Sequence, residues 1–305
     1  MKTLQRLSIA LILLSLLLLA VSCEMLDQAV QQGADLASSQ GLITDTQAGS
    51  IKKTSTAAAK SAEDITPSQE YYIGRSVAAT ILSQYRALDN NTLNIYLNTL
   101  GQTLALASEK PETFRGYRFM ALDTDEINAF AAPGGFILVS RGLIRCCPNE
   151  DALAAVLAHE IAHVQYGHGK RAIQNSRLTN LFGVVATEAA KNLEDQQLAQ
   201  LTQDFSGAVN DVVTQLVRNG YSQSAEYQAD KGAVAILKNI GYDPQALRVM
   251  LQSMEKRLTP GSAGFGKTHP SPKDRIANIE SLLGAPHTLV STPGRDARFR
   301  STAAI

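Results

Sequence analysis

The chain has 305 residues, of which 45% are hydrophobic and 18% charged, as in a globular protein that can bury a core. The 28 basic and 28 acidic residues cancel, so the charge gives no support to a nucleic-acid partner. The length suffices for one large domain or two small ones.

The first 22 residues have the order of a secretory signal. Two basic residues precede an apolar run over 7–21, and Ser22 and Cys23 follow. The run is short for a membrane span, and small residues before a cysteine resemble a bacterial lipoprotein signal, in which Cys23 becomes the lipid-modified first residue. Ala20 stands where such signals more often carry Leu, so an ordinary cleaved signal and a retained anchor are the alternatives. Cleavage removes two bases and no acid, which moves the net charge from 0 to −2.

Residues 23–66 are rich in small and polar residues and are expected to form a flexible tether. Glu24 directly after Cys23 favours the outer membrane over the inner one, by resemblance to known sorting rules. Cys146 and Cys147 are neighbours, and a disulfide between adjacent residues is strained. We therefore expect them to fill space as small apolar side chains.

Helices are predicted from residue 67 to about 88, opened by a Thr cap and a Pro, and from 91 to 107. A strand is predicted over 117–122, and residues 128–140 predict two extended pieces around a Pro-Gly-Gly turn. These pieces form either a hairpin packed on the core or a sheet edge that pairs with an extended peptide. In the second case the candidate substrate-binding residues are Asn128, Ala129, Phe130, Gly134 and Gly135.

Apolar residues at helical spacing after Asn149 predict a helix that carries His159, Glu160 and His163. The two histidines are four residues apart and lie on one face, where both can bind a single zinc ion. Glu160 lies between them and can deprotonate a metal-bound water. His168 falls one residue too early for the third ligand of an HExxHxxGxxH motif, so we expect it to be a helix-terminal residue.

A largely helical insertion is predicted between residues 170 and 220. Its apolar stripe indicates core packing or, alternatively, a lid over the active-site groove. The stripe consists of Leu198, Leu201, Phe205, Val209, Val212 and Leu216.

A later helix, opening near Ser224, places Glu226 and Asp230 on one face. Glu226 can complete the zinc site and Asp230 can accept the free N–H of a ligand histidine, whereas the alternative is two acids on a solvated helix. His269 lies in a Pro-rich turn before a last helix over 274–283. Because three protein ligands leave one zinc position open, His269 has three candidate roles: to cap the zinc, to donate to the oxyanion, or only to pack.

Four motifs in this order resemble the zinc metallopeptidase family that includes the CAAX prenyl endopeptidase, HtpX and BepA. They are Asn128-Ala129-Phe130 with Pro133-Gly134-Gly135, the HExxH segment, Glu226 with Asp230, and His269-Pro270 with Arg275. The resemblance covers residues 67–284 and implies an α+β, mainly helical zincin-type domain with a small β-sheet beside the active-site helix. It implies one Zn²⁺ per chain, with His159, His163 and Glu226 as ligands, Glu160 as base, and Asp230 and Arg275 around the ligands.

Two departures accompany the resemblance. Gln223 stands where relatives usually carry Arg before the ligand helix. We also expect neither the membrane-spanning helices of HtpX nor the C-terminal repeat domain of BepA, so the resemblance is strongest to compact lipid-anchored periplasmic members. Residues 285–305 are expected to be a disordered tail.

The resemblance implies a zinc-dependent endopeptidase that acts on envelope proteins from the periplasmic side, anchored through Cys23, in the outer membrane rather than the inner one. Its expected partners are protein or peptide substrates, the membrane and the outer-membrane assembly machinery. One alternative is a non-proteolytic chaperone that retains the zinc site, which Glu160 disfavours because a binder has no use for that base. Another is a structural zinc site, which is disfavoured because three ligands with a neighbouring Glu suit an open catalytic position.

Overall fold

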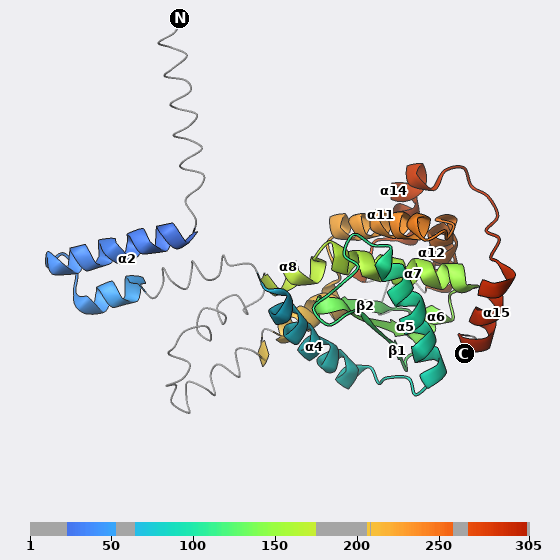
Figure 1. The fold of residues 1–305 in the computed structure, drawn as a ribbon, viewed down its shortest axis with the longest axis horizontal. Coiled ribbons are helices and arrows are strands. Elements are labelled where there is room, and N and C mark those ends of the chain that lie inside the picture. Colours follow the sequence, from blue (N-terminus) through green and yellow to red (C-terminus); the bar gives the residue numbers. More distant parts are fainter. Residues whose placement is uncertain (1–22, 53–64, 175–205, 208, 259–267, 304–305) are drawn as a thin grey trace, which may run out of the picture. The chain divides into compact units, whose positions relative to one another are not determined.

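The computed structural model describes residues 23–52, 65–174, 206–207, 209–258 and 268–303 (Figure 1). The chain divides into two compact units, with described residues 23–52 in the first and the others in the second. The apolar run over 7–21 and the first half of the predicted stripe lie outside the described residues. Among the helices that are described, none is both long and apolar enough to span a bilayer.

The first unit contains helix α2 (Cys23–Ser39) and a second helix that begins at residue 45. Lys52 forms an ion pair with Asp35, and its carbonyl accepts a hydrogen bond from Gln31. We expected a flexible tether here, and the structure shows helix in part of it, which the Ala, Gln and Leu content of the segment favours. That this segment serves as a tether stays a prediction.

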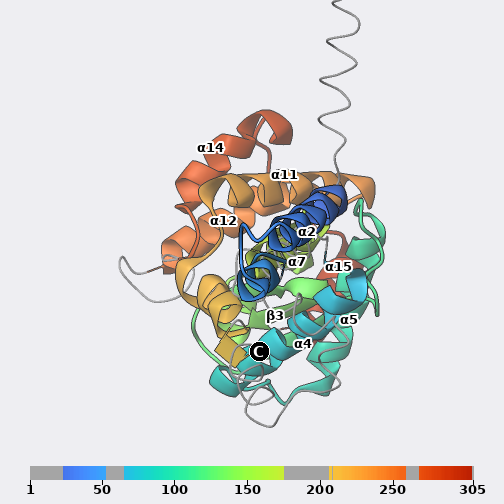
Figure 2. The same ribbon diagram turned by 90° about the vertical axis from the view of Figure 1, so that its left-hand side faces the viewer.

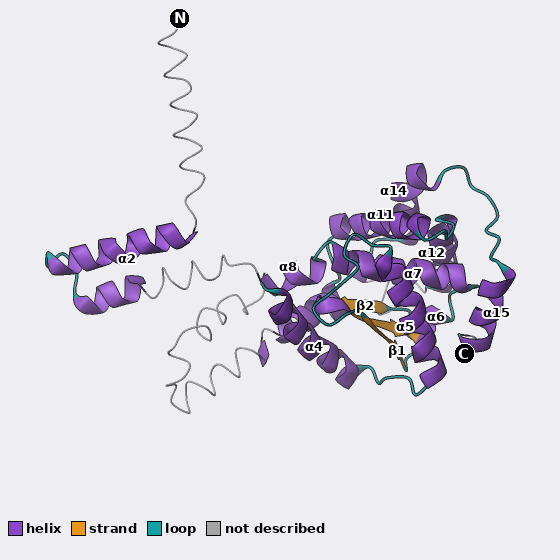
Figure 3. Cartoon of the chain, in the orientation of Figure 1, coloured by secondary structure: helices purple, strands orange, loops and turns teal. Residues whose placement is uncertain are grey.

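The second unit begins with two helices and a three-stranded sheet in the described chain (Figure 3). The strand order is β1-β3-β2, with β1 parallel and β2 antiparallel to β3. Helix α4 begins with the predicted capping box at Thr66, but ends before residue 88 because Tyr85 is extended. The elements are α4 (Pro67–Gln84), α5 (Asn91–Leu106), β1 (Arg118–Leu122), β2 (Ala129–Ala132), the short 3₁₀ turn η1 (Pro133–Gly135) and β3 (Phe136–Ser140).

The rest of the second unit, as far as it is described, is mainly helical and is arranged around α7 (Glu150–Gln165), which is buried from its first residue to Val164. Helix α11 lies along α7, and helices α12 and α5 cover other parts of it (Figure 2). Strand β2 also packs on α7. The remaining elements are α6 (Arg141–Ile144), α8 (His168–Gln174), the π-helical turn η3 (Gln215–Asn219), α11 (Gln223–Asn239), α12 (Gln245–Arg257), α14 (Pro272–Leu283) and α15 (Pro293–Thr302). This architecture confirms the α+β, mainly helical fold with a small sheet beside the HExxH helix.

The C-terminal segment is not the disordered tail that we expected. Helix α15 packs on α7, where Arg295 pairs with Asp151 at 2.9 Å and Arg298 pairs with Glu150 at 2.6 Å. Buried carboxylates need such partners. The prediction was wrong because these acids lie far away in the sequence, so the composition of the tail alone did not show its contact.

Candidate active site

Helix α7 carries the HExxH segment in the centre of the core. The Asn149 side chain caps the helix by accepting from the Ala152 N–H at 2.9 Å. His159, Glu160 and His163 are all buried, at 2%, 4% and 1% exposure. A group that is so buried must find its polar partners inside the protein, so the neighbouring elements determine its chemistry.

Helix α11 brings Glu226 to the two histidines. The histidine Nε2 atoms are 3.1 Å apart, and each lies 3.5 Å from one carboxylate oxygen of Glu226. Ligands of a tetrahedral zinc ion lie about 3.3 Å from one another, so the three side chains fit such an ion. Within the described part of the chain, both oxygens of Glu226 are buried without a hydrogen-bond partner, which is costly unless a cation binds there. The donor set therefore fits the metal that the sequence predicted.

Asp230 and Arg275 lie behind His159. Asp230 Oδ1 is 3.0 Å from His159 Nδ1, and Arg275 donates to both carboxylate oxygens of Asp230, at 2.6 and 2.9 Å. Arg275 Nη2 also lies 3.1 Å from His159 Nδ1. Because an ionised carboxylate only accepts, the pairing with Asp230 places the imidazole proton on Nδ1 and leaves Nε2 toward Glu226. Arg275 and Asp230 are both fully buried, so each charge depends on the other.

His168 lies against the second histidine, a contact that the sequence did not predict. Helix α7 ends after Gln165, and Gly167 has a φ of 65°, which turns the chain so that α8 begins at His168. His168 Nδ1 is 2.7 Å from His163 Nδ1. The glycine directly before His168 was the available signal, because a left-handed residue can reverse the chain onto the preceding turn.

His269 also faces the site. Its Nε2 atom lies 3.5 Å from Glu226 Oε2, and its Nδ1 atom is 2.8 Å from the Thr268 hydroxyl. His269, His159 and Glu160 each place one potential ligand atom within 4.8 Å of the others. The structure therefore brings His269 into the same cluster as the three candidate ligands.

Tyr221 covers His163 and contacts the sheet. Its ring stacks on the His163 ring with centroids 4.5 Å apart, and its hydroxyl donates to the carbonyl of Ala131 in β2 at 3.2 Å. The preceding Gly220 leaves no room for a side chain, because a Cβ there would lie 1.8 Å from the Thr268 carbonyl oxygen. The segment of Gly220 and Tyr221 thus packs closely against Thr268 beside the site, and no motif in the sequence pointed to Tyr221.

Strand β2 ends the described sheet and packs on α7, as expected for a sheet edge beside the active site. The five candidate substrate-binding residues divide into two groups. Asn128 supports the hairpin through bonds with Ser140 and Glu126, and Ala129 and Phe130 are buried in β2. Gly134 and Gly135 pack elsewhere: the Gly134 N–H donates to Glu70 of α4, and a Cβ at Gly135 would meet Thr113.

Burial and neighbouring charges shift the pKa values of the clustered side chains. Burial raises the pKa of Glu160 to about 7 and lowers that of His269 to about 4. Burial also lowers the pKa of His163. Burial and the Arg275 charge lower the pKa of His159, but the neighbouring carboxylates of Asp230 and Glu226 outweigh them and raise it to about 9.

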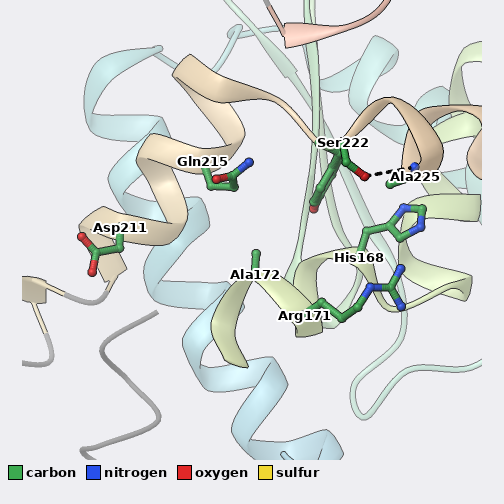
Figure 4. Close-up of a pocket in the computed structure, with 8 residues that line it drawn as sticks. His168, Arg171, Ala172, Asp211, Gln215, Ser222 and Ala225 are labelled. Carbon is green, nitrogen blue, oxygen red and sulfur yellow. Dashed lines mark hydrogen bonds between the residues drawn. The ribbon is translucent and has the colours of Figure 1, made fainter. Parts of the chain in front are cut away.

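A pocket opens next to His168, between α8, η3 and the start of α11 (Figure 4). His168 and Arg171 lie on its wall, and the Ser222 hydroxyl there caps α11 by accepting from the Ala225 N–H at 3.3 Å. The other lining residues are Ala172, Asp211, Gln215 and Tyr221. The pocket is thus lined by His168 and Tyr221, the two side chains whose rings contact His163.

A buried helix with two histidines and a glutamate, completed by a glutamate from a second helix, defines a metallopeptidase. A model of peptidase family M48 matches residues 91–283, so the chain belongs to this family and is classed as a metalloendopeptidase.

Similar proteins include the beta-barrel assembly-enhancing protease of Escherichia coli K12, which is 27% identical over 75% of this chain and 46% of that protein. The protein of the same name from Yersinia pestis is 31% identical over 66% of this chain and 41% of its own length. The metalloprotease LoiP of E. coli K12 is 28% identical over 63% of this chain and 70% of its own length. The chain thus matches less than half the length of the first two.

Proposed function

We propose that this protein is a zinc-dependent endopeptidase of the bacterial envelope that degrades envelope proteins in quality control. The observation that carries the proposal is the buried carboxylate of Glu226, whose two oxygens face two imidazole nitrogens at 3.5 Å and have no hydrogen-bond partner among the residues that the structure describes. His159, His163 and Glu226 would hold one zinc ion. When bound, the ion supplies a Lewis acid that polarises a carbonyl and lowers the pKa of water.

Glu160 is the proposed general base. Because burial raises its pKa to about 7, it can accept a proton from the attacking water and then pass that proton to the leaving amine. Asp230, held by Arg275, fixes the orientation of His159. His269 lies close enough to cap the site in a resting state or to donate to the oxyanion during turnover. The carbonyl edge of β2 is the proposed surface for an extended substrate.

The test is a casein digest that compares the wild type, Glu160→Gln and a chelated sample. Glu160→Gln should keep zinc and fold but lose turnover by on the order of 10²–10⁴-fold, because an amide cannot accept the proton. Equal turnover in this variant would exclude the mechanism. His269→Ala in the same assay separates its two roles, since loss of a cap raises turnover and loss of an oxyanion donor lowers it by ~100-fold.

The proposed location rests on the signal-like N-terminus and on relatives whose printed name refers to β-barrel assembly. We propose lipid anchoring at Cys23, on the periplasmic side and in the outer membrane, with the assembly machinery as a partner. Cys23→Ser should move the protein from the membrane to the soluble fraction, because acyl chains would be the main anchor. If that variant still sediments with membranes, the run over 7–21 is retained and the lipoprotein proposal is wrong.

A further inference from the structure

The two candidate histidine ligands are supported by different groups. His159 has a carboxylate, Asp230, on its Nδ1 atom at 3.0 Å. His163 instead has another imidazole there, with His168 Nδ1 at 2.7 Å. Two neutral rings in contact through the same kind of atom can bond only if one carries the proton and the other does not. Which one carries it decides the chemistry of His163, because the proton of a neutral imidazole occupies either Nδ1 or Nε2.

The next residue in the chain of contacts resolves this choice. The side-chain oxygen of Gln228 lies 3.2 Å from His168 Nε2. An amide oxygen only accepts, so His168 must carry its proton on Nε2 and leave Nδ1 with a lone pair. That lone pair accepts the Nδ1–H of His163, and the His163 Nε2 lone pair then faces Glu226 and His159.

We propose that His168 is a positioning residue which, oriented by Gln228, holds the proton of His163 on Nδ1 and so keeps Nε2 free to bind the metal. This inference rests on the metal site of the proposed function. The opposite tautomer of His168 would place the His163 proton on Nε2, among the metal-binding atoms, where it must be removed before an ion can bind. Glu226 and Gln228 come from one helix, so α11 would supply both a ligand and the group that begins this relay.

The sharpest test separates the hydrogen bond from the shape of the ring. His168→Phe keeps the ring against His163 but removes the acceptor. His168→Asn loses the ring but places its Oδ1 atom where Nδ1 was, one bond beyond Cγ, and so keeps an acceptor. Ala is a poorer choice, because the adjacent pocket could admit a water that replaces the acceptor.

The readout is zinc affinity, measured by competition with a chelating dye on the full-length chain. His168→Phe should weaken zinc binding by about 10- to 100-fold, and His168→Asn should stay within about threefold of the wild type. A packing role predicts the reverse order, with Phe close to the wild type and Asn impaired. Gln228→Leu should also weaken binding while Gln228→Glu, which keeps the accepting oxygen, should not. Equal zinc affinity of His168→Phe and the wild type would overturn the inference.

A second measurement does not depend on any variant folding. In the zinc-loaded wild type, nitrogen-15 NMR of the histidine rings should show His168 protonated on Nε2 alone. A proton on His168 Nδ1 would overturn the inference. Failure of the wild type to bind zinc would instead contradict the proposed function, so the two failures can be told apart.

Discussion

An acidic side chain is buried at each end of helix α7, but the two carboxylates differ in the hydrogen bonds that they accept. At the first turn, Glu150 accepts from the hydroxyls of Tyr96 and Tyr242 at 2.9 and 2.8 Å and from two N–H groups of Arg298. Near the other end, Glu226 of α11 contacts the helix with both oxygens buried and with no hydrogen-bond partner among the described residues. Donors from the chain thus satisfy both oxygens of Glu150, whereas the oxygens of Glu226 face imidazole nitrogens that are themselves acceptors.

This difference teaches how to separate a structural cluster from a reactive one in the same core. A buried carboxylate that its own chain fully satisfies gains nothing from a further ligand, and its role is to hold elements together. Glu150 does this by joining α5, the segment at Tyr242, and α15 to the start of α7. A buried carboxylate without donors, beside two imidazole lone pairs, needs a cation to be stable. Both carboxylates are buried, so it is the presence or absence of donors that distinguishes the Glu150 cluster from the Glu226 cluster.

The largest expected effect is on the zinc-dependent part of stability. Glu226→Ala removes one of three ligands, so chelation should no longer change the unfolding free energy of the variant. In the wild type, chelation should remove about 4 kcal/mol at a zinc concentration 1,000 times the dissociation constant. Denaturant unfolding with and without chelator measures both. A variant that still gains the wild-type increment from zinc would show that Glu226 is not a ligand.

At the other end of α7, Glu150→Ala should lower the unfolding free energy by roughly 2–4 kcal/mol, because two buried hydroxyls lose their acceptor and the buried end of an ion pair is lost. This loss should be the same with and without zinc. Arg298→Ala is the matched control: its side chain is 58% exposed, so its removal should cost less. A zinc-dependent effect of Glu150→Ala would contradict the separation of the two clusters.

The smallest effect on zinc binding is expected at Asp230, which contacts the candidate ligand His159 but not the metal. Asp230→Asn keeps the shape but weakens the acceptor for His159 and leaves the Arg275 charge unbalanced. Zinc affinity should fall about 10- to 100-fold, which corresponds to about 1.4–2.8 kcal/mol. Competition with a chelating dye measures the zinc affinity of this variant. The ratio of its affinity to that of Glu226→Ala shows which of the two carboxylates contributes more to zinc binding. An unchanged affinity would make Asp230 a purely structural partner of Arg275.

The sequence by itself determined the elements whose signals are local. The Thr cap before Pro67, the two extended pieces around the Pro-Gly-Gly turn and the helix that carries HExxH all appear in the structure as predicted. These features depend on neighbours within about four residues, a distance at which backbone geometry alone places side chains together. The pairing of Glu226 with the HExxH helix could be predicted as well, through the order of the motifs.

Only the tertiary structure decided which buried groups meet. The C-terminal helix reaches Glu150 across 148 positions, and Arg275 reaches Asp230 across 45. His168 was expected to be a helix end, and the left-handed turn at Gly167 returns its ring to His163. Such contacts depend on how helices pack around α7, since the desolvation cost of a buried charge is offset only by a partner that folding brings close to it. A single sequence shows the groups but does not show the distances between them.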